Sequence, residues 1–401
     1  MLRPGSFALT VLLSSLTALA PLSMDMYLPS LPDIGASLGA PTAQVQLTIA
    51  SYLFGFGTGQ IFYGPASDRF GRRPVILVAI AIFGIASVAC VVAPSIHALI
   101  AARFIQAVGG AGASVLARAV VRDIYSGTRA GRELSLMGSI TALAPIVAPM
   151  IGGMLQTAFG WRSCFVLLVV FAAASATVVT FLLPETLHKR MSGPFSLAAM
   201  GALYRSILVN RGFRANLGIL TASFVGLFAW ISGAPIVMQG HVYGLSPLLF
   251  GFTFSIGAVG YLTGTFIGSR IVMRVGLDRV MGLGTLAMTA GGLIMIAVIA
   301  SGAVNVIWFV GTMTIFLAGA GLTLPSSMAG ALTPFPDRAG TASSVMGFVQ
   351  QSSAGLAAAG LGLYLGHSAW PVVVVVAVSG AAACLIWALT HDARAAELAK
   401  S

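Results

Sequence analysis

The sequence predicts an all-α integral membrane protein with twelve transmembrane helices, arranged as two pseudo-symmetric halves of six. Three observations predict this fold. Of the 401 residues, 58% are hydrophobic and only 8% are charged, too few charges to cover a water-soluble protein of this length. The apolar residues form twelve runs of about 20 residues, the length that crosses a bilayer. Short motifs also recur a little over 200 residues apart.

Each apolar run is a predicted span. The twelve spans cover residues 7–28, 44–64, 74–93, 97–120, 133–158, 163–183, 214–239, 248–271, 279–300, 304–328, 341–364 and 371–390. The first could also be a signal peptide, because Arg3 precedes an apolar core and residues 18–20 resemble a cleavage site. Because the apolar stretch continues to Leu28, we expect a retained span.

The basic residues predict the topology. Of 21 Lys and Arg residues, only Arg162 is expected in a loop on the side opposite the N-terminus, and only Arg103 lies well inside a span. Under the positive-inside rule, both termini and the long central loop are cytoplasmic.

Other readings of the composition are weaker. The net charge of +11 raises a nucleic-acid interpretation, but the basic residues lie in short gaps between apolar runs, as membrane topology requires. Cys90, Cys164 and Cys384 lie far apart within apolar runs, without the spacing of metal ligands. We expect no nucleic-acid partner, no disulfide framework and no metal site.

The longest connection divides the chain. Residues 185–213 are a predicted cytoplasmic linker between an N-terminal half at 1–184 and a C-terminal half at 214–401. Within the linker, the weakly amphipathic stretch 195–208 predicts a helix in the headgroup region. An unstructured linker is the alternative.

The two halves repeat each other. Residues 69–71 (RFG) before span three correspond to 274–276 (RVG) before span nine, and residues 129–131 (RAG) correspond to 338–340 (RAG). Repeated halves around a central site are typical of transporters.

A charged motif lies between spans two and three, at residues 64–73 (GPASDRFGRR). A small glycine permits close helix approach, and an acid favours the positive N-terminal end of a neighbouring helix. A solvated loop is the alternative. The motif resembles that of the major facilitator superfamily, in which this loop is a conformational latch. The resemblance implies a gating role for Gly64, Asp68, Arg69, Gly71 and Arg73. The second half has Met273 where the acid is expected, so its latch is weaker or differently paired.

Span four carries Arg103, followed by Gln106. A guanidinium within a span is costly unless it is paired or lines a watery cavity. It could also extend to the outer headgroups. The spacing resembles the family's fourth-span motif, which implies that Arg103 supports proton transfer.

Span five contains two prolines and a glycine pair, which bend a helix and permit close packing. These residues are Pro145, Pro149, Gly152 and Gly153. A generic kinked helix is the alternative. The pattern resembles the family's antiporter motif, with Ala144 and Ala148 where glycine is usual, and it favours exporters over symporters.

The end of span one, residues 24–32 (MDMYLPSLP), and residues 118–123 (RAVVRD) resemble the bicyclomycin and chloramphenicol resistance branch of drug:proton antiporters (Bcr/CflA). The resemblance extends from about residue 7 to 390. It implies a monomer in the bacterial inner membrane.

Asp25 is the one acidic residue predicted clearly within a span, since Asp33 is expected in the outer loop and Glu133 at the start of span five. A carboxyl group in an apolar cavity can take up and release a proton. We therefore expect Asp25 and Arg103 to couple proton movement to transport. A static Asp25–Arg103 ion pair is the alternative. All five histidines lie near span ends, so a histidine relay is not expected.

Candidate substrate contacts are aromatic, thioether and amide side chains on spans expected to line the cavity. They are Met24, Tyr52, Phe224, Phe228, Trp230, Gln350 and Gln351. Lipid contact or core packing is the alternative for each one.

The sequence therefore predicts proton-coupled efflux of small hydrophobic drugs by alternating access, driven by the proton gradient without a cofactor. A symporter of a small metabolite on the same fold is the main alternative. An intramembrane enzyme would need clustered acids or His/Ser pairs, and a receptor or scaffold would need larger loops. No P-loop sequence is present for ATP.

Overall fold

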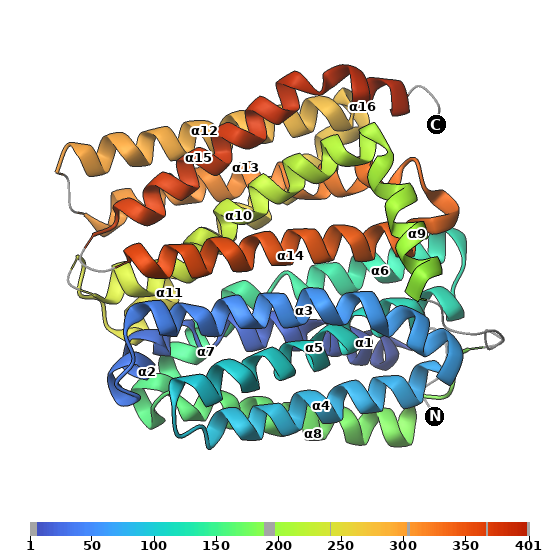
Figure 1. The fold of residues 1–401 in the computed structure, drawn as a ribbon, viewed down its shortest axis with the longest axis horizontal. Helices are drawn as coiled ribbons and strands as arrows, with labels where there is room; N and C mark the ends of the chain where they lie inside the picture. Colours follow the sequence, from blue (N-terminus) through green and yellow to red (C-terminus); the bar gives the residue numbers. More distant parts are fainter. Residues whose placement is uncertain (1–5, 188–196, 241, 303–304, 366–367, 399–401) are drawn as a thin grey trace. The chain divides into compact units, whose positions relative to one another are not determined.

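The computed structural model describes residues 6–187, 197–240, 242–302, 305–365 and 368–398 (Figure 1). These residues form helices and connecting turns, and none of them is in a β-strand. The chain divides into two compact units, unit 1 (Met1–Pro194) and unit 2 (Phe195–Ser401). The division falls inside the predicted linker, residues 185–213.

Unit 1 contains the first half of the predicted spans. Its helices are α1 (Phe7–Asp25), η1 (Leu28–Ser30), α2 (Leu31–Ser37), α3 (Thr42–Phe70), α4 (Arg72–Val91), α5 (Ile96–Ile124), α6 (Gly127–Thr141), α7 (Ala144–Phe159) and α8 (Arg162–Leu182).

Unit 2 contains the second half. Its helices are α9 (Leu197–Val209), α10 (Arg211–Gln239), α11 (Pro247–Val275), α12 (Leu277–Ala300), α13 (Val306–Leu332), η2 (Pro336–Arg338), α14 (Ala339–Tyr364), α15 (Trp370–Leu389) and α16 (His391–Leu398).

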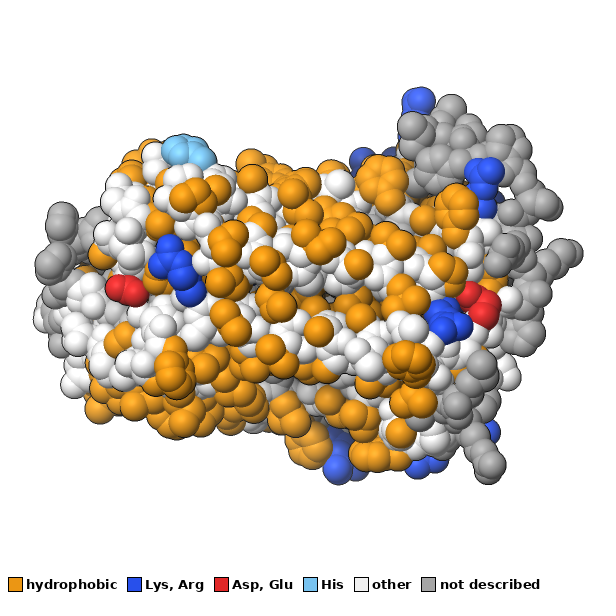
Figure 2. Space-filling view, turned by 90° about the horizontal axis from the view of Figure 1, so that it is seen from below, with side chains coloured by type: hydrophobic (Ala, Val, Ile, Leu, Met, Phe, Trp, Pro, Cys, Tyr) orange, Lys and Arg blue, Asp and Glu red, His pale blue; other side chains and the backbone are white. Residues whose placement is uncertain are grey.

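Each of the twelve predicted spans falls on a helical segment. Ten described segments are both long and apolar enough to cross a membrane. The other two spans fall on α3 and α14, which have 29 and 26 residues but carry more polar side chains, such as Gln46 and Gln350. The face shown in Figure 2 is largely hydrophobic, and its charged side chains lie mainly toward the two ends. This distribution is that of a multi-pass membrane protein.

The sequence predicted one continuous span over residues 7–28, but the helix there is interrupted. α1 ends at Asp25, a turn follows, and η1 and α2 continue the chain to Ser37. Within a helix, a proline ring clashes with the carbonyl four residues earlier, and Pro29 stands four residues after Asp25. Asp25 is therefore the last residue of α1, at a helix break. Asp33, expected in a loop, lies in α2.

The fifth span is also broken, so the prediction of one helix over residues 133–158 is wrong. α6 ends at Thr141 and α7 begins at Ala144. Pro145 occupies the first turn of α7, where its missing N–H is tolerated, and Pro149 lies within the helix. Pro145 thus separates two helices instead of bending one.

The two units repeat the same close helix contacts. A Cβ atom on Gly55 would lie 2.3 Å from the backbone oxygen of Phe104, so α3 packs directly against α5. In unit 2, a Cβ on Gly260 would lie 2.7 Å from the oxygen of Thr314, joining α11 to α13. These positions correspond at intervals of 205 residues (55 to 260) and 210 residues (104 to 314). Tertiary packing therefore follows the internal repeat.

The linker contains a helix, so the unstructured alternative is wrong for residues 197–209. α9 packs against α10 and α14, with Ile207 fully buried and Leu208 exposed. Part of its apolar face therefore contacts protein, and its position in the headgroup region stays a prediction.

Candidate functional site

Asp25 lies buried at the end of α1. Only 5% of its surface is exposed. Among the described residues, no side chain pairs with its carboxylate, by ion pair or by hydrogen bond. The static Asp25–Arg103 ion pair that the sequence left open is therefore absent from this structure.

Arg103 on α5 is fully buried and bonded to neutral groups. Its Nη1 donates to the hydroxyl and carbonyl of Ser23, at 2.9 and 3.1 Å, and to Gln106 Oε1 at 2.6 Å. The guanidinium carbon lies 4.2 and 4.1 Å from the ring centroids of Tyr27 and Tyr52. Aromatic faces stabilise a desolvated cation. The charge is thus accommodated inside the protein, and Arg103 does not extend to the headgroups.

Side chains from other helices bind the backbone around the α1 break. The Tyr52 hydroxyl donates to the carbonyl of Ala20 at 3.0 Å, and the Cys164 thiol donates to that of Met26 at 3.5 Å. With Arg103 on Ser23, side chains of three helices bind carbonyls in the last turns of α1 and just after it, and the Ser23 carbonyl is among those that a helix end leaves unpaired. These contacts fix the backbone on both sides of Asp25. Sequence reasoning missed Ser23. The spacing of Arg103 and Gln106 does place those two side chains on one helix face, but it does not indicate which residue of α1 they meet.

The predicted antiporter motif packs against this same backbone. A Cβ atom on Gly152 of α7 would lie 1.8 Å from the carbonyl oxygen of Met26, a distance that no side chain tolerates. Pro149 and Gly153 are buried, and Pro145 is half-buried. Gly152 therefore allows α7 to approach the residue that follows Asp25.

Two predicted substrate contacts join the Asp25 region. Met24 and Tyr52 are 4% and 2% exposed, and the Met24 sulfur lies 3.9 Å from Arg103 Nη2. In this structure both side chains contact protein, as the packing alternative proposed.

The predicted contacts in unit 2 belong to different groups. The rings of Phe224 and Phe228 lie 4.5 Å apart on α10. Trp230 is fully buried and packs on Phe254 and Phe309, with centroids 6.0 and 5.2 Å away. Gln350 and Gln351 are half-buried on α14.

The charged motif at residues 64–73 is more helical than predicted. α3 continues through Phe70, Gly71 alone forms the turn with φ +103°, and α4 begins at Arg72. Only glycine adopts this backbone conformation readily. Gly64 meets no atom within 4 Å of a built Cβ, so the close helix approach expected there does not occur.

Arg72, which the predicted gating set omitted, is the centre of the motif. Its Nη1 pairs with Asp68 at 2.6 Å, and its Nε pairs with Asp123 of α5 at 2.7 Å. Arg73 donates to the carbonyl of Thr180, and Arg69 lies over the Phe70 ring. The sequence shows all three arginines, but only the fold indicates which one is enclosed by acids.

Glu185 performs the role that the sequence assigned to Asp68. Its carboxylate accepts the first N–H groups of α4, from Arg72 at 2.9 Å and Arg73 at 3.2 Å. Burial alone would raise the pKa of Glu185, but these donors and the N–H groups of Thr186 and Leu187 lower it below its usual value. The acid at the positive end of α4 therefore comes from the segment after α8.

A metal site would need several His, Cys, Asp or Glu side chains close together. Across the described parts of the chain, no group of three or more His, Cys, Asp and Glu side chains could hold a metal ion.

Relatives of known name cover most of this chain. It is 31% identical to multidrug resistance protein D of Escherichia coli, over 89% of each chain. It is 32% identical to a bicyclomycin resistance protein homolog of Haemophilus influenzae, over 87% of each chain. A chloramphenicol resistance protein of Pseudomonas aeruginosa is also 32% identical, covering 92% of this chain and 87% of the relative.

The fold has a counterpart among solved structures. A partially occluded, inward-open structure of the xylose transporter XylE from E. coli matches with a TM-score of 0.72, over 94% of this chain and 96% of that one, at 17% identity. Residues 13–358 match the family model described as Major Facilitator Superfamily. With its repeated helical units and its buried charged site, this chain belongs to the major facilitator superfamily of membrane transporters.

Proposed function

We propose that this protein exports small hydrophobic drugs in exchange for protons, by alternating access across the bacterial inner membrane. The observation that carries the proposal is the Asp25 carboxyl group, buried at a helix break without a paired cation. An ionised carboxylate is costly to bury alone. It becomes favourable when it binds a proton or an electropositive part of a substrate, and these two ligands then compete.

This competition gives an exchange cycle. Ionised Asp25 favours binding of substrate from the cytoplasm. Protonation from the outside removes the charge, lowers the affinity for substrate and favours release. A ligand shifts a conformational equilibrium only through its different affinity for the two states, so each exchange requires that Asp25 change its charge.

Arg103 acts beside Asp25 as a fixed positive charge. Its bonds to Ser23 join it to the backbone two residues before the acid. A displacement of α5 would therefore move α1, and the environment of Asp25 would change with it. Arg103 thus links the protonation site to the packing of unit 1.

The substrate class follows from the names of the relatives and from the local side chains. The relatives are named for resistance to several drugs, to bicyclomycin and to chloramphenicol. Met24 and Tyr52 are buried in this structure, so their thioether and aromatic surfaces become available to a substrate only when the site opens. Both termini are proposed to be cytoplasmic, the protein a monomer, and the proton gradient the energy source without a cofactor.

The test compares drug-driven proton movement in everted vesicles containing the parent, Asp25→Asn or Asp33→Asn. Asp33 is the matched control, because it is an exposed acid eight residues along the chain. We expect chloramphenicol-like compounds to dissipate an imposed proton gradient with the parent and Asp33→Asn but not with Asp25→Asn. Equal responses of all three would refute the role of Asp25. No response from the parent across a broad compound panel would refute drug export.

A further inference from the structure

The turn between α11 and α12 repeats the charged turn of unit 1, but without the charges that pair there. Gly276 has φ +84°, as Gly71 has φ +103°. At the interval of 205 residues, Leu277 replaces Arg72 and Met273 replaces Asp68. At the interval of 210 residues found for α5 and α13, Thr333 replaces Asp123. The ion pairs of Arg72 therefore have no equivalent at these positions of unit 2.

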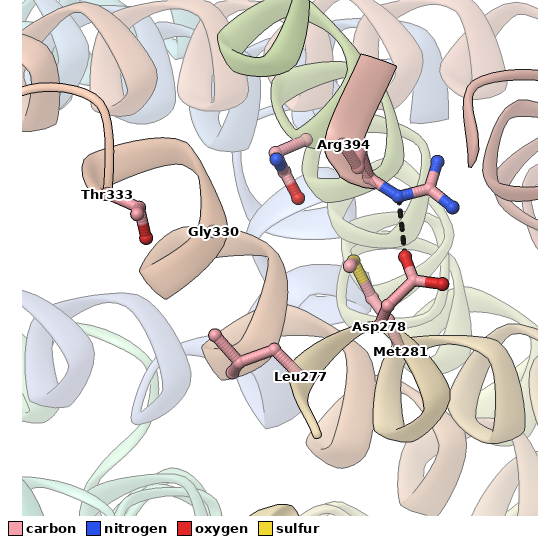
Figure 3. Close-up of a pocket in the computed structure, with 7 residues that line it drawn as sticks. Leu277, Asp278, Met281, Gly330, Thr333 and Arg394 are labelled. Atoms are coloured by element: carbon pink, nitrogen blue, oxygen red, sulfur yellow. Dashed lines mark hydrogen bonds and ion pairs between the residues drawn. The ribbon is translucent and has the colours of Figure 1, made fainter. Parts of the chain in front are cut away.

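A different ion pair lies at the same end of unit 2. Arg394 of α16 is 2% exposed, and its Nε lies 2.8 Å from Oδ1 of Asp278 in the first turn of α12 (Figure 3). Arg394 Nη2 donates to the carbonyl of Trp387 at 2.7 Å. The Trp387 indole N–H donates to the carbonyl of Asp278 at 3.1 Å. α16 is thereby joined to the start of α12 directly by Arg394 and indirectly through Trp387 of α15.

The segment after the last span of each unit supplies a charged side chain to the helix that follows the glycine turn, but the charge and its partner differ. Asp278 follows Arg73 by 205 residues, and Arg394 follows Glu185 by 209, the interval that also relates residues 129 and 338. In unit 1, the segment after the sixth span supplies an acid to the start of α4. In unit 2, the segment after the twelfth span supplies a base to an acid at the start of α12.

A small pocket occupies the place of the missing Arg72–Asp123 pair. Leu277 and Thr333 line it, and the Asp278–Arg394 pair forms part of its wall (Figure 3). It has about 10 Å³ of free space, roughly the room for one water molecule. Asn216 also lines it, is 3% exposed, and has an Oδ1 atom without a hydrogen-bond partner among the described residues. An unpaired buried acceptor makes complete closure of this end of the unit less stable.

We propose that α16 is a clasp that opens and closes this end of unit 2 during transport, with Arg394 as its positioning residue. The clasp is a single ion pair, where unit 1 has the two ion pairs of Arg72 and the backbone cap by Glu185. When Arg394 leaves Asp278, the pocket opens and water reaches Asn216. The role of the clasp in transport rests on the proposed export function, but the opening of the Arg394–Asp278 pair and of the pocket does not.

The test measures access to the pocket directly. Met281 lines the pocket and is 2% exposed, so Met281→Cys reports opening by its rate of reaction with a soluble maleimide. The protein is purified in nanodiscs, and the same chain without Met281→Cys gives the background from its own cysteines. We expect Arg394→Gln to increase the reporter's labelling rate several-fold. Asp392→Asn, an exposed acid on the same helix, is the matched control and should change nothing.

A rescue separates the clasp from general damage. In the Arg394→Gln protein, Leu277→Arg with Thr333→Asp installs the unit 1 pair inside the pocket and should restore protection of the reporter. The exchange Asp278→Arg with Arg394→Asp should restore it in part, because arginine is disfavoured in a first helical turn. Unchanged labelling in Arg394→Gln, or fast labelling despite both rescues, would overturn the clasp. A parent that exports no drug yet shows this labelling pattern would refute the proposed function and leave the clasp standing.

Discussion

The guanidinium of Arg103 lies over the ring of Tyr52, with 4.1 Å between carbon Cζ and the ring centroid. The Tyr52 hydroxyl donates to the carbonyl of Ala20 on α1, and Arg103 Nη1 donates to the carbonyl of Ser23. Two side chains from α3 and α5 thus bind the same helix end while they stack on each other. Because this arrangement stabilises the positive charge, Asp25 is not needed as its partner.

Tyr52→Phe and Tyr52→Leu separate the ring from the hydroxyl. The first substitution removes one buried hydrogen bond and should cost about 1 kcal/mol. The second also removes the cation–π contact and should cost about 2 kcal/mol more. Thermal unfolding of the purified protein in detergent measures the difference. Equal losses for both variants would contradict a stabilising role of the ring.

Arg103→Met tests whether the charge serves function more than folding. The equivalent position in unit 2, 210 residues later, is the fully buried Met313, so a thioether fits this place in the fold. We expect a folded, monodisperse protein that no longer exchanges protons for drug in everted vesicles. Arg132→Met, on an exposed arginine of α6 outside the predicted motifs, is the control and should still transport.

Gly152→Val should displace α7 from the α1 break, because its Cβ would overlap the carbonyl oxygen of Met26. Such overpacking costs about 1–3 kcal/mol, and movement of the backbone beside Asp25 should abolish proton exchange. Gly138→Val on α6 is the matched control, since no atom lies within 4 Å of its built Cβ. The prediction therefore includes a loss of stability and a loss of proton exchange. Normal exchange by Gly152→Val would show that the close contact is dispensable.

Glu185→Gln should destabilise unit 1 in a pH-dependent way. The pKa of Glu185 is lower in the folded protein than in the unfolded chain, where it is about 4.3. Its stabilising contribution is therefore complete above the unfolded pKa and is lost as pH falls through the folded pKa. A lost helix cap costs about 1 kcal/mol.

Unfolding temperatures of the parent and Glu185→Gln should accordingly differ at pH 7 and converge below about pH 4. Asp392→Asn gives the background, because its carboxylate is fully exposed outside this cap. A difference that stays constant from pH 7 to pH 3 would contradict charge-dependent capping of α4.

Sequence reasoning predicted features that depend on residues close together in the chain better than contacts between residues far apart in it. The twelve apolar runs, the internal repeat and the family follow from local composition and short motifs, and these predictions are confirmed. The breaks after Asp25 and Thr141 were missed, although prolines four residues later mark both positions. The pairing of Arg72 with Asp123 could not be predicted, because 51 residues separate them in the chain. Asp25 stays a prediction as the proton site.

The sequence by itself determined where this chain can cross a membrane, since a bilayer accepts only long apolar segments that satisfy their own backbone hydrogen bonds. It also determined that the halves are related, since the repeat survives in glycines and in short charged motifs. Only the tertiary structure decided which charges meet. Arg103 contacts aromatic rings and Ser23. Glu185 caps α4 where Asp68 was expected, and Arg394 pairs with Asp278. Such pairings depend on distances between helices, which no local pattern of residues encodes.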